Sequence, residues 1–149
     1  MSHRINPYIV AKQQMEAVYA FNAATKQTAI EPLLLELVKT RASQINGCAF
    51  CLEMHTREAR EMGETEARLH LLTAWRESSL YAPRERAALA WTEALTNLSQ
   101  TGAPDADYEL ALAQFNDAEL VELTLAIAMI NVWNIFGVGF RRPHAKPKA

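Results

Sequence analysis

The sequence predicts an all-α protein of about six to seven helices, folded as a single domain over residues 1–149. Apolar residues recur three and four positions apart through most of the chain, which is the period of a helix with one buried face. Residue types that begin and end helices stand at the ends of these segments. No segment alternates between apolar and polar residues as a half-buried strand does. A chain of 149 residues, half of them hydrophobic, also suits one core rather than two.

The first four helices are predicted from their start and stop signals. Pro7 and Pro32 each precede an apolar pattern of helical period, and proline suits the first helical position because its missing N–H needs no partner there. The Asn46-Gly47 pair ends the second pattern, directly before Cys48. The predicted helices span residues 7 to about 24, 32 to 46, about 48 to 62, and 65 to about 75.

Three more helices complete the predicted fold. Pro83 begins a fifth helix, whose apolar side chains line one face to about residue 98. Asp105 can cap a short helix, and Asn116 or Asp117 can cap a long apolar one that reaches residues 136–139. No repeat or linker divides the chain, and we expect the basic tail from Arg141 onward to fray.

Composition and charge narrow the function. A net charge of -2 and a pI of about 6.1 give no broad positive field, so we do not expect nucleic acid as a partner. Arg4, Asn6 and Pro7 stand where a signal peptide needs an unbroken apolar stretch, and we expect no later apolar run to reach the length of a membrane span. These features predict a cytoplasmic protein that does not contact a membrane.

The two cysteines of the chain, Cys48 and Cys51, are three residues apart, and His55 follows four residues later. Residues with these spacings share one face of a helix. Such a close pair cannot join distant segments, and the first turn of a helix stabilises a thiolate through its free N–H groups and partial positive charge. His55 is then placed to accept the proton of Cys51, directly or through a water. The pattern therefore indicates nucleophilic thiol chemistry.

A carboxylate can orient such an imidazole, and three acidic residues lie near enough in sequence to do so. On the helix that carries the motif, Glu53 faces away from Cys51, and Glu58 belongs to an outward charged run. Glu36 differs because it stands among leucines and a valine, where a carboxylate is unexpected unless something pairs with it. We therefore predict that Glu36 is the partner of His55 and that burial raises its pKa.

Other interpretations of the cysteine pair stay open at this point. The two thiols could be small buried hydrophobes, or they could bind zinc together with His55, although no second Cys or His pair supplies further ligands. Attached haem is excluded because Leu52, not histidine, follows Cys51. A thioredoxin fold needs a strand before the motif, and none is predicted there. We expect no bound cofactor and no metal.

The run that joins Glu36, Cys48-Ala-Phe-Cys51 and His55 resembles the signature of the AhpD-like alkylhydroperoxidases of the carboxymuconolactone decarboxylase family. Residues 83–95 and 130–134 resemble family segments as well, so the similarity covers most of the chain. Members of this family are all-helical and commonly assemble as trimers or hexamers. The resemblance therefore implies an AhpD-like helical domain in a homo-oligomer. We expect this oligomer to cover exposed apolar stripes, particularly those around Leu123 to Val132.

The resemblance also implies a function. In that family the cysteine matching Cys51 attacks the peroxide, the one matching Cys48 resolves it as a disulfide, and the equivalents of Glu36 and His55 form a proton relay. This implies a thiol-dependent hydroperoxide reductase that is reduced again by a dithiol, such as a lipoamide-carrying protein. Alternatives are a disulfide reductase or thiol carrier, and a non-enzymatic redox-sensing or zinc-binding helical oligomer. Phe50 stands where the best-studied relatives have a histidine.

Overall fold

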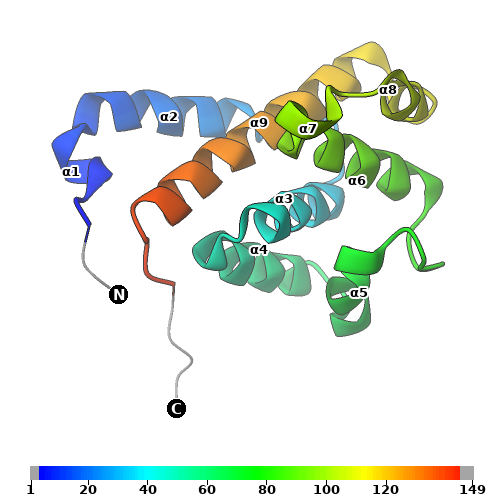
Figure 1. The fold of residues 1–149 in the computed structure, drawn as a ribbon, viewed down its shortest axis with the longest axis horizontal. Helices are drawn as coiled ribbons and strands as arrows, with labels where there is room; N and C mark the ends of the chain where they lie inside the picture. Colours follow the sequence, from blue (N-terminus) through cyan, green and yellow to red (C-terminus); the bar gives the residue numbers. More distant parts are fainter. Residues whose placement is uncertain (1–3, 145–149) are drawn as a thin grey trace.

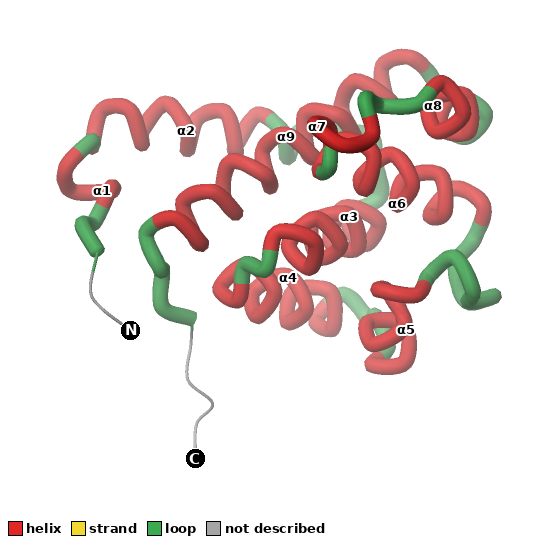
Figure 2. The backbone as a smooth tube through the Cα atoms, in the orientation of Figure 1, coloured by secondary structure: helices red, strands yellow, loops and turns green. Residues whose placement is uncertain are grey.

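The computed structural model describes residues 4–144, and the prediction of an all-α protein is confirmed. Every regular element in this range is a helix, as Figures 1 and 2 show. The elements are α1 (Pro7–Val10), α2 (Lys12–Ala24), α3 (Pro32–Asn46), α4 (Ala49–Glu61), α5 (Glu66–Leu71), the 3-10 helix η1 (Leu72–Ala74), α6 (Pro83–Thr96), α7 (Leu98–Thr101), α8 (Asp105–Leu112) and α9 (Asp117–Gly139).

The centre of the fold is α3, which packs against α4, α6 and α9 (Figure 1). Pro32 occupies its first turn, and Gly47 ends it in the left-handed conformation, with φ at 65°. Leu37 and Val38 in its middle are fully buried, and they contribute to two separate apolar clusters. Burial of neighbouring faces of α3 in two clusters fixes this helix in the middle of the protomer, and with it the residues that flank the motif.

The long helix α9 begins at a capping box, in which Asn116 Oδ1 accepts a hydrogen bond from the N–H of Glu119 at 3.0 Å. The expectation that no apolar run reaches the length of a membrane span is wrong for this helix, which is 23 residues long and apolar enough by composition. Core helices of globular proteins pass the same test. Here Leu123, Ile127 and Ile130 are buried within the protomer.

The described range holds nine α-helices rather than six or seven, because short helices separate from their longer neighbours. Ala11 leaves the helical conformation with φ at -124° and ψ at 49°, and this splits the first predicted helix into α1 and α2. Asn97 similarly separates α6 from α7. Neither break has a proline or glycine at it, so the local sequence gives no signal for either one.

The start of the basic tail is ordered, which corrects the expectation that it frays from Arg141 onward. The N–H of Arg142 donates to Gly137 O at 2.9 Å, and its side chain donates to the hydroxyl of Tyr8 at 2.8 Å. The segment after α9 is thereby held against α1, so both ends of the described chain lie near the motif (Figure 1). Residues 145–149 of the tail lie outside the described range.

Candidate functional site

The thiol pair lies where α3 gives way to α4. The N–H of Cys48 donates to Ser43 O at 3.0 Å, which follows from the left-handed Gly47 between the two helices. Cys48 is the N-cap residue of α4, and its Sγ accepts a hydrogen bond from the N–H of Cys51 at 3.4 Å. Both cysteines are free and buried, with their sulfurs 2.6 Å apart. The predicted helix start is thus correct to within one residue.

The last turns of α9 cover this thiol pair. A Cβ atom at Gly137 would lie 2.6 Å from Cys48 Sγ, so only glycine leaves room for the sulfur. One turn earlier, Asn134 is buried and accepts a hydrogen bond from Asn46 at 2.9 Å while donating to Ser43 at 3.0 Å. These contacts join the end of α3 to α9 and hold the backbone on which the two thiols stand.

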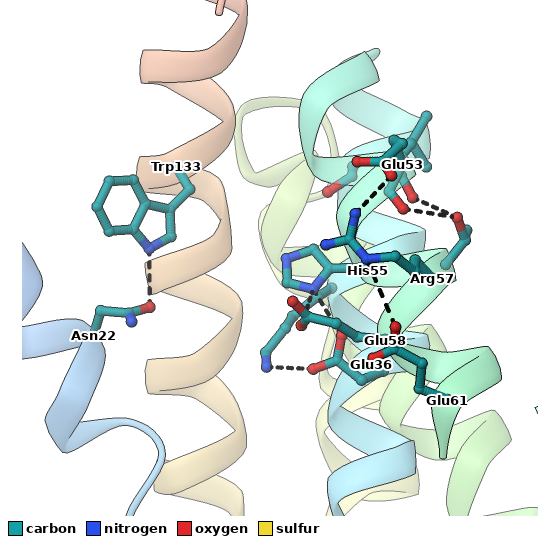
Figure 3. A network of polar contacts seen from close by, with 12 residues as sticks. Asn22, Glu36, Glu53, His55, Arg57, Glu58, Glu61 and Trp133 are labelled. Carbon is teal, nitrogen blue, oxygen red and sulfur yellow. Dashed lines mark hydrogen bonds and ion pairs between the residues drawn. The ribbon is translucent and has the colours of Figure 1, made fainter. Parts of the chain in front are cut away.

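The structure brings Glu36 and His55 together as a buried pair. His55 Nδ1 lies 2.7 Å from Glu36 Oε2, and the exposed fractions of these residues are 5% and 3% (Figure 3). The other oxygen of Glu36 accepts a hydrogen bond from Lys39 at 2.7 Å. Since α3 supplies the carboxylate and α4 the imidazole, their contact depends on the packing of these two helices.

The pKa of Glu36 is lowered, which corrects the expectation that burial raises it. Burial alone does raise this pKa, but the hydrogen bond and charge of His55, together with those of Lys39, outweigh it. Glu36 therefore remains a carboxylate and acts as an acceptor. His55 Nδ1 is then the donor, and its Nε2 is left to exchange a proton with another group. A structural carboxylate in this position orients the imidazole rather than carrying a proton itself.

The two other acidic residues on α4 have different surroundings. Glu53 turns outward as predicted and pairs with Arg57 at 2.7 Å. Glu58 was expected to face outward as well, but its Oε2 lies 3.7 Å from His55 Nδ1, and it is half-buried (Figure 3). Residues three apart on a helix are neighbours, so the spacing from His55 to Glu58 was the signal for this contact.

The acidities of the two thiols differ from the expectation that Cys51 is the activated one. The hydrogen bond shared with the Cys51 thiol lowers the pKa of Cys48 to about 6, although burial opposes this. The same hydrogen bond, together with burial, raises the pKa of Cys51. Within residues 4–144, no hydrogen bond joins His55 to Cys51. A proton passing between these two side chains therefore needs a bridging water or substrate.

A pocket of about 240 Å³ opens beside the motif, between α2, α4 and α9. Cys51 lines it and Cys48 does not, so the sulfur that an incoming molecule meets first is that of Cys51. In Figure 3, Trp133 and His55 project from different helices, and the indole N–H of Trp133 donates to Asn22 at 2.9 Å. The lining residues are Tyr19, Asn22, Thr25, Lys26, Lys39, Phe50, Cys51, Met54, His55, Glu58, Ala126, Met129, Ile130, Trp133 and Arg142.

Sequence reasoning missed Arg142 as a member of the site. Its guanidinium lies 3.8 Å from the centre of the ring of Phe50, a residue between the two cysteines in the sequence. Arg142 also lines the pocket together with Cys51. No motif spacing could have found it, because it reaches the pocket only after the chain turns at the end of α9. The resemblance did single out Phe50, but not the cation that stacks on it.

Glu36, His55 and Glu58 have oxygen and nitrogen atoms within 4.8 Å of one another, close enough to hold a cation. Neither cysteine joins this group in the part of the chain that is described, so the zinc alternative built on Cys48, Cys51 and His55 lacks its ligand geometry. The Lys39 ammonium already occupies one oxygen of Glu36. The donor set therefore fits a hydrogen-bonded carboxylate and imidazole pair.

Comparisons with known proteins agree on the relatives of this chain. The profile of the Carboxymuconolactone decarboxylase family matches residues 13–94, more than half of the sequence. The uncharacterized protein YdfG of Bacillus subtilis is 42% identical over 134 residues, which are 90% of this chain and 91% of that protein. The uncharacterized protein YnjA of Escherichia coli is 30% identical over 107 residues, which are 72% of this chain and 58% of that protein.

Two solved structures show the same fold. The crystal structure of an Agrobacterium tumefaciens protein of unknown function, described as a candidate antioxidant defence protein AhpD, superposes with a TM-score of 0.94 and 42% identity. It covers 98% of this chain and 100% of that one. A peroxidase-related protein from Silicibacter superposes with a TM-score of 0.77 at 21% identity, over 88% of this chain and 70% of that one, and this likeness shows the fold alone.

Proposed function

Since the chain belongs to the carboxymuconolactone decarboxylase family, as its motif predicted, we propose that it is an AhpD-like, thiol-dependent hydroperoxide reductase. The observation that carries the proposal is the pair of free thiols 2.6 Å apart, of which Cys51 lines the same pocket as His55. The Agrobacterium protein, described as a candidate antioxidant defence protein, is similar over its full length.

In the first step, Cys51 attacks the terminal oxygen of the hydroperoxide. An S–O bond forms, the O–O bond breaks, and the product is an alcohol together with a sulfenic acid on Cys51. The proton of the Cys51 thiol passes to His55 Nε2 through a bridging water and then to the departing alkoxide. Glu36 stabilises the imidazolium that forms meanwhile, which is the role its lowered pKa suits.

In the second step, the Cys48 thiolate attacks the sulfur of the sulfenic acid. A disulfide forms and the hydroxyl group leaves as water after taking up a proton. The lowered pKa of Cys48 supports this role, because a thiol with a pKa of about 6 is largely ionised at neutral pH. A dithiol, such as the lipoamide of a carrier protein, then reduces the disulfide and is itself oxidised. The sum converts hydroperoxide and dithiol into alcohol, water and disulfide.

The test mixes the reduced protein with excess hydroperoxide and follows thiol loss, peroxide loss and protein mass. The proposal expects an intramolecular Cys48–Cys51 disulfide, and sustained peroxide loss only when a dithiol is added. Cys51→Ser should abolish the reaction. Cys48→Ser should permit a single oxidation to sulfenic acid and then stop, because no resolving thiol remains.

The opposite pattern in the two variants would exchange the roles of the cysteines, since the helix terminus favours the Cys48 thiolate. Two free thiols that persist after oxidation would remove the peroxidase proposal. Disulfide reduction without peroxide consumption would instead favour a disulfide reductase or thiol carrier. Measuring metal content in the same preparation tests the zinc alternative.

A further inference from the structure

Two cations line the pocket without a carboxylate partner anywhere in the described range 4–144. Arg142 is held by the hydroxyl of Tyr8 at 2.8 Å and by the ring of Phe50, whose centre lies 3.8 Å from the guanidinium carbon. Lys26 is exposed at the pocket edge, and its amine has no ion pair. The third cation of the lining, Lys39, is occupied by Glu36.

The surroundings of Arg142 leave donors for a ligand. A guanidinium has five N–H groups in a planar fork that matches a carboxylate, and among the described residues the Arg142 side chain donates one hydrogen bond, to Tyr8. The stacking on Phe50 uses the face of the guanidinium rather than its donors. Because the group is already held in place, binding an anion immobilises little that was free before.

The remainder of the pocket is mainly apolar. Met54, Met129 and Ile130 contribute to its wall, and Trp133 adds a large aromatic surface. A volume of about 240 Å³ admits a molecule considerably larger than hydrogen peroxide. A molecule with an apolar body and one negative charge fits both the apolar wall and the Arg142 guanidinium.

We propose that this pocket takes organic hydroperoxides whose apolar body carries a carboxylate, with Arg142 binding the carboxylate while the peroxide group lies at Cys51. The inference rests on the proposed function and adds its substrate class. Lys26 contributes a second attraction at the edge, where solvent screens it more strongly. The neighbouring carboxylate of Glu58 lies on the side of His55, so it does not neutralise Arg142 by direct contact.

A competing role for Arg142 makes a different forecast. Its charge opposes the rise in the pKa of Cys51, so it could act on the thiol alone, whatever the substrate. In that case Arg142→Gln slows the oxidation of charged and neutral substrates by the same factor. If Arg142 binds the carboxylate, the loss falls mainly on the charged substrate.

The matched substrates are para-carboxy cumene hydroperoxide and its methyl ester, which share one apolar body. In the wild type we expect kcat/KM for the acid to exceed that for the ester by about tenfold, the size of one charge-assisted hydrogen bond. Arg142→Gln should bring this ratio near one, and Arg142→Lys should keep most of it. Arg57→Gln removes the same charge from α4 outside the pocket and should leave the ratio unchanged. A wild-type ratio of one, or a ratio unaltered by Arg142→Gln, overturns the proposal.

Binding of the two corresponding alcohols to the reduced protein separates this inference from the peroxidase proposal, because neither alcohol can oxidise a thiol. We expect the carboxylate alcohol to bind about tenfold more tightly than its ester, again through Arg142. If that preference is found but neither hydroperoxide is consumed, the peroxidase proposal fails and the carboxylate site stands. Equal binding of the two alcohols rejects the site.

Discussion

The Nδ1 of His55 and a carboxylate oxygen of Glu36 lie 2.7 Å apart, although the two residues belong to different helices. This contact fixes which nitrogen of the imidazole carries a proton, because the carboxylate accepts from Nδ1. The other nitrogen, Nε2, can therefore exchange a proton with a molecule in the pocket that His55 and Cys51 line. The roles proposed for all four motif residues depend on this single orientation.

Glu36→Gln is expected to slow oxidation of Cys51 at neutral pH by at least about tenfold, within the range of general acid-base assistance. The amide keeps the size and polarity of the side chain but removes the charge that stabilises protonated His55. The deficit should shrink toward pH 9, because proton removal from the thiol then depends less on the relay. Stopped-flow oxidation between pH 6 and 9 measures both effects.

Glu53→Gln is the control for this experiment, since Glu53 lies on α4 and its ion pair within residues 4–144 is with the exposed Arg57. It should leave the pH dependence of the rate unaltered. Parallel pH profiles for wild type and Glu36→Gln would remove Glu36 from the site and leave it a structural role.

The lowered pKa of Glu36 also predicts how stability depends on pH. A carboxyl with a pKa lower in the folded than in the unfolded state stabilises the fold above its unfolded pKa of about 4.3, and this contribution is lost as the pH falls through the folded value. The wild type should therefore exceed Glu36→Gln in stability at pH 5, and the gap should narrow toward pH 3. Thermal unfolding in that range decides the matter, and a constant gap would show that Glu36 is not ionised in the fold.

A further prediction concerns the hydrogen bond that the two thiols share. Thiolate absorbance of the reduced protein should show a first midpoint near the Cys48 pKa of about 6. Cys51→Ala removes the donor, so the midpoint should rise toward the value of about 8.5 for a free thiol. Cys51→Ser retains a donor and should give an intermediate value. If the midpoint stays near the wild-type value in both variants, the acidity of Cys48 comes from the helix terminus instead.

Gly137→Ala should destabilise the protein by about 1–3 kcal/mol, the usual cost of overpacking, and should slow closure of the disulfide. The new Cβ atom would lie 2.6 Å from Cys48 Sγ and would push the sulfur from its position. Gly139→Ala is the matched control in the same helix, because nothing lies within 4 Å of its Cβ position. Thermal unfolding and single-turnover disulfide formation give the two readouts. Equal behaviour of the two alanine variants would show that Cys48 has room to move.

Local signals predicted the parts of the structure that depend on local chemistry. Asn116 begins a helix because its side chain accepts a hydrogen bond from a free N–H, and Pro32 begins one because it has no N–H that needs a partner. Glu36 was predicted to belong to the site because a carboxylate among apolar neighbours needs a partner. The break at Ala11 and the position of Arg142 follow instead from packing between the two ends of the chain. Such contacts leave no mark in the neighbouring residues.

The ionisation of the site was also beyond sequence reasoning. The helical spacing located Cys48, Cys51 and His55 on one face, but spacing gives neither the distance between the sulfurs nor a bridging molecule. The pKa of Glu36 was predicted to rise from burial alone, whereas the interactions with His55 and Lys39 lower it. The direction of this pKa depends on how closely Lys39 and His55 approach the carboxylate, and the sequence does not give these distances.

The last prediction concerns the homo-oligomer and the apolar surface that it buries. The sequence placed the uncovered apolar surface around residues 123–132, but Leu123 and Ile127 are buried within the protomer. Of the large apolar side chains exposed on α9, one lies within this stretch and three lie before or after it. They are Val121 (59% exposed), Leu125 (41%), Ile135 (68%) and Val138 (46%).

Val121 and Leu125 are four residues apart, and Ile135 and Val138 are three apart, so each pair lies on one face of α9 that a second helix can cover. We therefore expect a homo-oligomer that buries this stripe, because a contiguous apolar face left in water marks an interaction surface. Ile135→Glu should shift the protein toward monomer in light scattering, since it introduces a charge into the covered face, and helical circular dichroism should be retained. Leu110→Glu changes an apolar residue of α8 that is 42% exposed and should not alter the mass. A wild-type monomer at micromolar concentration, or dissociation by Leu110→Glu alone, would place the interface elsewhere or remove it.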